Sequence, residues 1–299
     1  MTDLSRLRRG LLRAALAMAA TALSAVAAAQ PVVVRDDRGD ERRFAAPPHR
    51  IVSMLPSLTE TVWVLGGGPR LVGVDRYSDW PADIAKLPHL GGLDDAQIEA
   101  IAALKPDVVL ASTSSRAVER LEALGFVVVR LKSETYADVH RTLDLLAALL
   151  GTPEAGERTW AGLQRQIDAA AARVPPALRG QRVYFEVGGG PYAAGASSFI
   201  GETLARLGLA NIVPPQLGPF PKLNPEFVVR ARPDIILGPQ REQAGLADRP
   251  GWADLPAVRD HRLCGFDSAT YEMMIRPGPR MGEAASLLAD CLARLVPAR

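Results

Sequence analysis

Hydrophobic residues in the first half of the chain fall into short continuous runs, separated by stretches in which they recur at helical spacing. The continuous runs are RIVSM (50–54), RLVGV (70–74), DVVLA (107–111) and VVVRL (127–131). Helical spacing covers roughly 58–65, 95–104 and 115–124. Because β-rich runs alternate with helical patterns, this half is predicted to form βα units around a parallel sheet.

The second half repeats this alternation. Its continuous runs are RVYFEV (182–187), DIILG (234–238) and RLCGF (262–266), and helical spacing covers roughly 198–207 and 280–295. A chain of 299 residues is long enough for two domains of medium size. The pattern therefore predicts an α/β fold of two Rossmann-like lobes, with a ligand cleft between them.

A long amphipathic helix is predicted between the two halves. Thr152 suits the N-cap, Pro153 suits the first helical position, and Pro175-Pro176 ends the pattern. The apolar stripe is Trp160, Leu163, Ile167, Ala170, Ala171 and Val174. About 21 residues rising ~1.5 Å each reach roughly 32 Å. Since no Gly- and Ser-rich hinge is present, we expect a rigid backbone helix and little hinge closure.

These elements divide the chain into regions. We expect an N-terminal lobe at 30–151, a linker helix at 152–176 and a C-terminal lobe at 177–299. Residues 1–29 read as a signal peptide, because four Arg precede an Ala- and Leu-rich stretch that ends in Ala27-Ala28-Ala29. A short membrane anchor is the alternative reading of this segment. The signal peptide predicts export to the periplasm.

Removal of the leader changes the charge of the protein. The leader carries four Arg and one Asp, so the formal charge falls from +2 to −1. A mature chain without excess positive charge argues against nucleic acid as a partner. Two cysteines remain, Cys264 and Cys291, and in an exported protein they could form a disulfide or stay as two buried thiols.

One sequence motif, which we call the repeated phrase, occurs twice. IEAIAALKPDVVLA (98–111) and PEFVVRARPDIILG (225–238) match at a constant offset, which places Glu99 in register with Glu226 and Asp107 with Asp234. Two quasi-equivalent lobes would present the two glutamates as a pair to a two-fold symmetric partner with basic residues. Alternatively, each glutamate only stabilises the start of its helix.

Loops at the carboxyl ends of the predicted strands hold the candidate ligand-binding residues. In open α/β sheets ligands bind at these ends. The loops at 75–81, 188–198 and 267–280 contain Tyr77, Trp80, Tyr192, Tyr271, Met273, Met274 and Arg276. Aromatic rings, thioethers and a fixed cation suit a large, partly apolar ligand. The alternative is that these residues cap the sheet ends by ordinary packing.

Motifs for catalysis and for metal binding are missing. The chain has no G-x-S-x-G, no G-x-x-x-x-G-K-[ST] and no H-E-x-x-H. Its four scattered histidines and two distant cysteines give no metal-ligand spacing. We therefore expect a protein that is not an enzyme and that has no cofactor and no resident metal.

Five segments resemble one known family. They are RIVSMLPSLTETVWVLGGGPRLVGVDRYSDWP, LPHLGGLDDAQIEAIAALKPDVVLA, the linker helix, LNPEFVVRARPDIILG and RPGPRMGEAASLLA. Together they resemble the iron-siderophore, haem and cobalamin class of periplasmic substrate-binding proteins, which serve ABC importers, and the cobalamin-binding members most of all. The resemblance implies two α/β lobes with the ligand between them. It also implies that one acidic residue per lobe docks on arginines of a dimeric permease, at the positions of Glu99 and Glu226.

The resemblance also assigns ligand-contacting positions. Tyr77 and Trp80 match the aromatics of a Tyr-Ser-Asp-aromatic-Pro loop, and Arg276 matches an arginine of the last ligand loop. Leu93 and Met273 stand where cobalamin-binding relatives have stacking tryptophans. The tyrosine that haem-binding relatives carry near an LGG stretch is absent at Leu90-Gly91-Gly92.

The expected function is that of a monomeric periplasmic receptor. It would bind a metal chelate, cobalamin or another corrinoid, and deliver it to an inner-membrane ABC permease dimer. A ferric siderophore or haem receptor is the alternative within the class, and clustered arginines from Arg76, Arg276 and Arg280 would favour it. Two alternatives from other classes are an exported α/β enzyme and a module that binds another protein.

Overall fold

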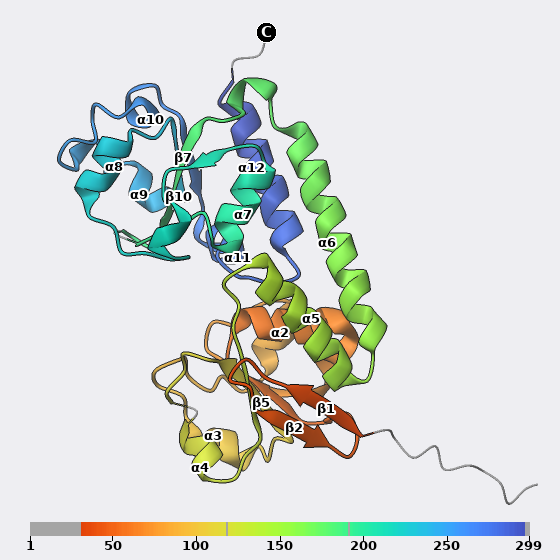
Figure 1. Cartoon of the computed structure of the whole chain (residues 1–299). Helices are drawn as coiled ribbons and strands as arrows, with labels where there is room; N and C mark the ends of the chain where they lie inside the picture. Colours follow the sequence, from red (N-terminus) through yellow and green to blue (C-terminus); the bar gives the residue numbers. More distant parts are fainter. Residues whose placement is uncertain (1–30, 118, 191, 297–299) are drawn as a thin grey trace, which may run out of the picture.

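Two sheets of mostly parallel strands, one in each half of the chain, organise the fold (Figure 1). The computed structural model describes residues 31–117, 119–190 and 192–296. The expected signal peptide lies outside the described residues. In the described part of the chain, no helix is both long enough and apolar enough to cross a membrane.

The N-terminal lobe has a four-stranded sheet in the order β4-β3-β5-β6. The strands β3 (Ile51–Ser53), β4 (Leu71–Val74), β5 (Val108–Ser112) and β6 (Val128–Leu131) are all parallel. The helices are α2 (Pro56–Val62), α3 (Ile98–Ala103), α4 (Glu119–Ala123) and α5 (Tyr136–Leu150). The strands are almost wholly buried, as expected for a parallel sheet covered on both faces. An antiparallel hairpin, β1 (Val32–Arg35) and β2 (Glu41–Phe44), precedes them.

The C-terminal lobe is built around β7 (Arg182–Val187). Strands β10 (Ile235–Pro239) and β11 (Leu263–Phe266) continue the sheet in parallel on one side of β7. On the other side lie β8 (Tyr192–Ala193), which is antiparallel, and β9 (Ala210–Asn211), which is parallel. The helices are α7 (Phe199–Arg206), α8 (Pro225–Ala231), α9 (Gln240–Gln243), α10 (Pro256–Arg259), α11 (Ser268–Met274) and α12 (Met281–Arg294).

The predicted fold class is confirmed, and every predicted strand lies within two residues of an observed one. The sequence pattern missed α5, which begins with a capping box between Thr135 and Asp138. This helix has ten buried residues, and its apolar positions recur at helical spacing, so the signal was present in the sequence. The hairpin of β1 and β2 was also missed, because its strands are short and half polar.

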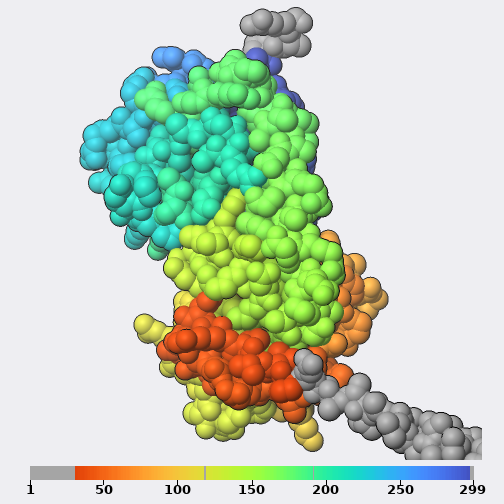
Figure 2. Space-filling model, turned by 45° about the vertical axis from the view of Figure 1, so that its right-hand side comes forward, coloured from red at the N-terminus to blue at the C-terminus, as the bar shows by residue number. Residues whose placement is uncertain are grey.

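A single long helix, α6 (Pro153–Arg173), connects the lobes along one side of the molecule (Figures 1 and 2). It packs closely on α5, since a Cβ on Gly156 would lie 2.9 Å from the Cα of Asp144. One contiguous apolar core runs from α5 through Leu163 and Ile167 of α6 to α12. The lobes therefore share their core, which limits hinge motion.

The predicted N-cap position of Thr152 is confirmed, although its side chain does not cap the helix. Thr152 occupies the N-cap position of α6, but its hydroxyl makes no cap hydrogen bond and lies 3.5 Å from the carbonyl oxygen of Ala147. The cause is the tight turn out of α5. Gly151 ends α5 in the left-handed region at φ 79°, and the Thr152 N–H then also donates to Ala147.

The repeated phrase encodes the same turn in both lobes. In the N-terminal lobe, the Asp107 carboxylate accepts the backbone N–H groups of His49 and Arg50 at 2.8 Å. The Arg50 side chain in turn donates to the carbonyl of Leu104 at the end of α3. The basic residue of the phrase, Lys105, is in the left-handed region at φ 47°.

The C-terminal lobe repeats the contacts of Arg50 at Arg182. The Asp234 carboxylate accepts the Arg182 N–H at 2.8 Å, and the Arg182 side chain donates to the carbonyl of Ala231 at the end of α8. Arg232 is left-handed at φ 48°. The basic residue, Pro and Asp at the centre of the phrase thus connect the end of a helix to the first strand of each sheet. This role does not involve Glu99 or Glu226.

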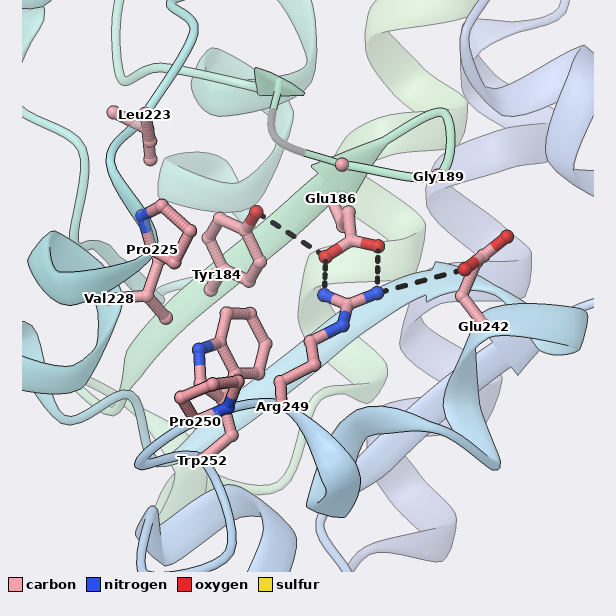
Figure 3. Close-up of a pocket in the computed structure, with 11 residues that line it drawn as sticks. Tyr184, Glu186, Gly189, Leu223, Pro225, Val228, Glu242, Arg249, Pro250 and Trp252 are labelled. Carbon is pink, nitrogen blue, oxygen red and sulfur yellow. Dashed lines mark hydrogen bonds and ion pairs between the residues drawn. The ribbon is translucent and has the colours of Figure 1, made fainter.

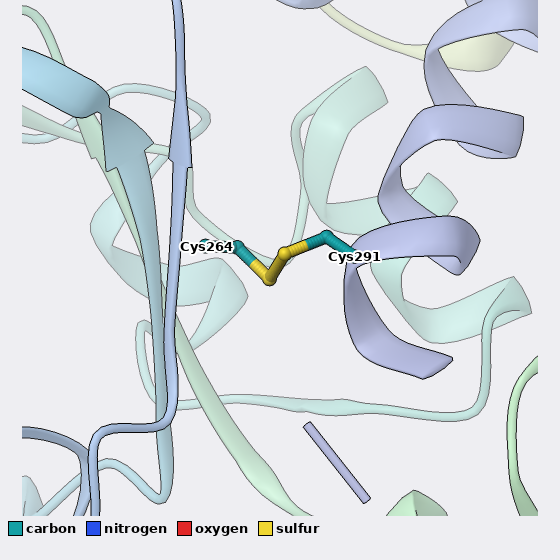
Figure 4. The surroundings of a disulfide bond; sticks show 2 residues. All are labelled: Cys264 and Cys291. Carbon is teal, nitrogen blue, oxygen red and sulfur yellow. A yellow bond between two sulfur atoms is a disulfide. The ribbon is translucent and has the colours of Figure 1, made fainter. Parts of the chain in front are cut away.

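A disulfide joins Cys264 of β11 to Cys291 of α12 (Figure 4). The Cα atoms lie 6.0 Å apart and the two residues are 27 apart in sequence. This decides between the two alternatives that the sequence left open. The bridge fastens the last helix to the outer strand of the C-terminal sheet.

Replacement of both cysteines by alanine is expected to lower the free energy of unfolding by roughly 3–4 kcal/mol. The reason is that a closed loop of this length restricts the unfolded chain. Urea unfolding of Cys264→Ala/Cys291→Ala beside the oxidised wild type measures the difference. Dithiothreitol should lower the stability of the wild type and leave that of the variant unchanged, and equal stability in oxidised and reduced wild type would contradict the prediction.

Candidate functional site

Loops that follow strands of the two lobes meet between the lobes. The carbonyl of Glu134, after β6, accepts the N–H of Phe199 at 2.7 Å, and the Tyr136 hydroxyl lies 2.8 Å from the hydroxyl of Thr203. The loop after β4 meets Arg276 of the C-terminal lobe. On the side away from α6, the surface recedes between the lobes (Figure 2).

Arg276 crosses from the C-terminal lobe into the N-terminal lobe. Its guanidinium donates to Glu60 at 2.9 Å, to Asp79 at 2.7 Å and to the carbonyl of Tyr77 at 3.0 Å. Arg280 stands 3.6 Å from the same Glu60 oxygen. Burial raises the pKa of Glu60, although the hydrogen bond from Arg276 and the charges of both arginines act to lower it. The arginine predicted to bind the ligand is thus 8% exposed and held by acidic partners.

The loop after β4 presents Tyr77 with its backbone fixed at both ends. The carboxylate of Asp75 accepts the Tyr77 N–H at 2.7 Å, and Arg276 donates to the Tyr77 carbonyl. Asp75 itself is buried, which raises its pKa. Tyr77 is 62% exposed, and the guanidinium carbon of Arg76 lies 5.9 Å from the centroid of its ring. An exposed ring on a fixed backbone is suited to contact a ligand at low entropic cost.

Two further predicted ligand residues are exposed. Tyr192 is 48% exposed at the start of β8, where it pairs with Lys222, and Leu93 is 38% exposed. The carbonyl of Leu93 accepts a hydrogen bond from Ser115 at 3.0 Å. Sequence reasoning missed Phe220, which lies next to the segment paired with β8 and packs on Phe199 with ring centroids 5.9 Å apart. The Pro-Phe-Pro run around Phe220 was the available signal.

Trp80 faces the linker helix. The guanidinium carbon of Arg280 lies 4.8 Å from its ring centroid. Both side chains line a cavity of about 340 Å³ together with Gly162 and Gln166 of α6 and Pro279. This cavity includes residues from both lobes and from the helix, and Tyr77 does not line it.

Tyr271 and Met273, two of the expected ligand-binding residues, pack in the core of this structure. They are 4% and 3% exposed. The Tyr271 hydroxyl accepts the N–H of Gly188 at 2.7 Å and donates to the carbonyl of Glu186 at 3.1 Å. Burial raises the pKa of Tyr271 to about 12. The apolar face of α11 is buried in the core, and Tyr271 lies on this face. Its two hydrogen bonds therefore hold the loop after β7 from the side of the core.

Glu99 and Glu226 are exposed on α3 and α8. Their side chains are 81% and 77% exposed, and their nearest basic partners, Arg120 and Arg230, stand 3.6 and 3.8 Å away. Exposed pairs at such distances contribute little to stability. Both helices lie on the side of the molecule away from α6 (Figure 1). Both carboxylates are therefore available to a partner.

A cluster of possible metal ligands joins α5 to α6, and sequence spacing did not reveal it. His140, Asp144 and Glu157 offer ligand atoms within 4.8 Å of one another. The imidazole already lies 2.9 Å from the Glu157 carboxylate and stacks on Trp160 with ring centroids 4.6 Å apart. These contacts tie the two helices together. The side chains come from two helices, so no short motif signals them.

Comparisons with known proteins agree with this geometry. Residues 51–270 match the periplasmic binding protein family. A vitamin B12-binding protein of Pectobacterium atrosepticum is 29% identical over 84% of this chain and 90% of its own length. An uncharacterized ABC transporter substrate-binding lipoprotein of Bacillus subtilis, YvrC, is 25% identical over 88% of this chain and 85% of its own. The structure of the periplasmic heme-binding protein RhuT from Roseiflexus superposes with a TM-score of 0.70 at 27% identity, covering 83% of this chain and 98% of that one.

Proposed function

Because this chain belongs to the periplasmic binding protein family, we propose that it is a periplasmic receptor that binds cobalamin or another corrinoid between its lobes. The family consists of non-enzymatic substrate-binding proteins, so the chain is not an exported enzyme. It is an extracytoplasmic substrate-binding protein of an ABC importer, of the class that serves vitamin B12, haem and siderophores, and this role implies a permease partner.

The observation that carries the corrinoid proposal is the pair of exposed tyrosines on opposite lobes. Tyr77 and Tyr192 both follow strand ends, and both keep about half or more of their surface exposed. A corrinoid has a broad face with apolar edges that two such rings can cover. Leu93 lies on the loop beyond Tyr77 and adds apolar surface. Vitamin B12-binding relatives support the same ligand.

The charges of the site speak against an anionic ferric siderophore. Such a ligand needs free arginines, and the candidates were Arg76, Arg276 and Arg280. Each of them has an acidic partner in the described structure: Asp95 for Arg76, Glu60 for the other two. Haem stays the second candidate, because a heme-binding structure superposes well on this chain and because an exposed tyrosine such as Tyr77 can ligate iron.

Delivery to the permease is the second part of the proposal. Glu99 and Glu226 would dock on arginines of a permease dimer, one glutamate per lobe. Their exposure and their common side of the molecule support this role. The protein would act as a monomer, divided into lobes at 30–151 and 177–299 with the linker at 152–176.

Calorimetric titration of the mature protein, residues 30–299, tests the ligand. The panel is cyanocobalamin, dicyanocobinamide, haemin and a set of ferric siderophores. The proposal expects tight one-to-one binding of a corrinoid. Tight binding of haemin or of a siderophore alone would keep the transport role and refute the corrinoid assignment.

Replacement of Tyr77 or Tyr192 by alanine is expected to weaken binding about tenfold or more each. Burial of an aromatic ring contributes roughly 1.5–3 kcal/mol, and about 1.4 kcal/mol is a factor of ten. Thermal stability should stay within about 0.5 kcal/mol, since both rings are exposed. The control is Leu217→Ala, another exposed apolar side chain of the C-terminal lobe. Unchanged affinity in both tyrosine variants would place the ligand elsewhere.

A further inference from the structure

A cavity of about 460 Å³ lies within the C-terminal lobe, beside the loop that leads to Tyr192 (Figure 3). This volume falls within the roughly 300–1,000 Å³ of small-molecule sites. Its apolar wall consists of Tyr184, Leu223, Pro225, Val228, Pro250 and Trp252. Glu186 and Arg249 lie beside this wall, and Glu242 stands at the far end (Figure 3).

The equivalent place in the N-terminal lobe is filled. Ile51 pairs with Val108 there, as Val183 pairs with Ile235 in the C-terminal lobe, so Met54 is the counterpart of Glu186. Met54 is 1% exposed and packs in a closed apolar cluster with Leu90 and Ile98. The fold therefore does not require a cavity at this position, since apolar side chains occupy it in the described part of the N-terminal lobe.

An ion pair between Arg249 and the buried carboxylate of Glu186 lines the polar side of the C-terminal cavity. The guanidinium of Arg249 donates to both oxygens of Glu186 at 2.5 and 2.9 Å, and Glu186 is 2% exposed. A buried ion pair is commonly no more stabilising than apolar residues of the same size. A gain in stability therefore does not explain why the C-terminal lobe has this ion pair where the N-terminal lobe has the apolar Met54.

The charges around the cavity are already balanced. Arg249 neutralises Glu186 and approaches Glu242 at 3.7 Å, while Arg241 stands 3.4 Å from the other Glu242 oxygen. A charged ligand would find no free counter-ion among these four groups. The remaining wall is apolar and includes two aromatic side chains, Tyr184 and Trp252, beside Leu223, Pro225, Val228 and Pro250. The Trp252 ring packs edge-on against Tyr184 at 5.9 Å, and Arg249 covers it at 4.7 Å. Such a wall suits an uncharged planar ring.

The cavity adjoins the proposed corrinoid surface. Gly189 and Gly190 line its edge, three and two residues before Tyr192, and Leu223 follows Lys222, which pairs with Tyr192. A ligand that rests on Tyr192 can therefore extend a side group into the cavity. We propose that the C-terminal cavity binds an uncharged aromatic side group of the chelate, such as the benzimidazole base of a complete corrinoid.

This inference rests on the proposed function. Two measurements distinguish a failure of the inference from a failure of the proposed function. The first compares the affinity of cyanocobalamin with that of dicyanocobinamide, which has the same ring system without the base. Wild type should bind cyanocobalamin at least about tenfold more tightly, the order expected when one aromatic ring leaves water. Leu223→Trp, which fills the cavity, should abolish this preference and keep the affinity for dicyanocobinamide. Leu217→Trp is the matched control on an exposed residue of the same lobe.

The second measurement uses the free base and needs no corrinoid site. Dimethylbenzimidazole should quench tryptophan fluorescence in wild type and much less in Trp252→Phe. Equal affinity for the two corrinoids, or quenching that does not depend on Trp252, would overturn the inference and leave the transport role intact. If no corrinoid binds at all, the corrinoid assignment fails, and the free base alone decides whether the cavity takes an aromatic ring. Should Leu223→Trp fail to fold, the free-base measurement still decides.

Discussion

Reversal of charge at both Glu99 and Glu226 is expected to reduce uptake of the ligand at least about a hundredfold. Each charge-assisted hydrogen bond contributes roughly 1.5–3 kcal/mol, and two of them together exceed the roughly 2.7 kcal/mol of a hundredfold change. The measurement is transport into proteoliposomes that contain the cognate permease. Ligand affinity of the free Glu99→Arg/Glu226→Arg protein should equal that of wild type, because neither residue lies at a proposed ligand contact.

The control must carry the same change in net charge. Glu41→Arg/Glu154→Arg reverses two exposed carboxylates, on β2 and at the start of α6, and should transport normally. Each single reversal at Glu99 or Glu226 should give an intermediate loss. Transport at the wild-type rate by the double variant would mean that the glutamates only stabilise the starts of their helices.

Removal of the Arg276 side chain is expected to lower the free energy of unfolding by about 3–5 kcal/mol. The reason is that Arg276→Met leaves Glu60, which is 1% exposed, as a buried charge with only the more distant Arg280 as a partner. The same change releases the carbonyl of Tyr77, so ligand affinity should also fall. Urea unfolding and calorimetric titration measure the two effects.

The matched variant is Glu60→Gln, which keeps the shape and removes the charge. We expect it to be less destabilising than Arg276→Met, because a neutral amide costs less to bury than an unpaired carboxylate. If Arg276→Met were no more harmful than Glu60→Gln, the contact between the lobes would not depend on this ion pair.

The pH dependence of stability gives a further check on Glu60. Its folded pKa is raised above the ordinary 4.5, so the folded protein holds the proton more tightly than the unfolded chain. Glu60 therefore contributes stability that is fully present below pH 4.5 and is lost as the pH rises through the raised pKa. Glu60→Gln should remove this pH-dependent contribution. The difference in the free energy of unfolding between wild type and Glu60→Gln should therefore be smaller at neutral pH than at pH 4.5. A difference that does not change with pH would contradict the raised pKa.

The sequence determined the architecture because local patterns encode it. Apolar runs such as 107–111 and 234–238 are fixed as strands by continuous hydrophobicity, and the turn residues before them repeat in both lobes. The helix α6 was predicted because Pro153 and the apolar stripe are local signals. The resemblance to substrate-binding proteins depends on the same stretches, and family membership is confirmed.

Only the tertiary structure decided which side chains are free to act. In the sequence, Tyr77, Tyr271 and Arg276 cannot be told apart, because each is a large side chain with a polar end in a loop that follows a predicted strand. In the structure their exposure differs. Tyr271 lies on the buried face of α11, and Arg276 forms an ion pair with Glu60, which is 216 residues away in sequence, whereas Tyr77 is exposed. The disulfide and the C-terminal cavity also depend on contacts between distant segments. The periodic pattern of apolar residues determines whether a segment forms a helix or a strand. Which residue contacts a charged or aromatic side chain depends on how distant segments pack together.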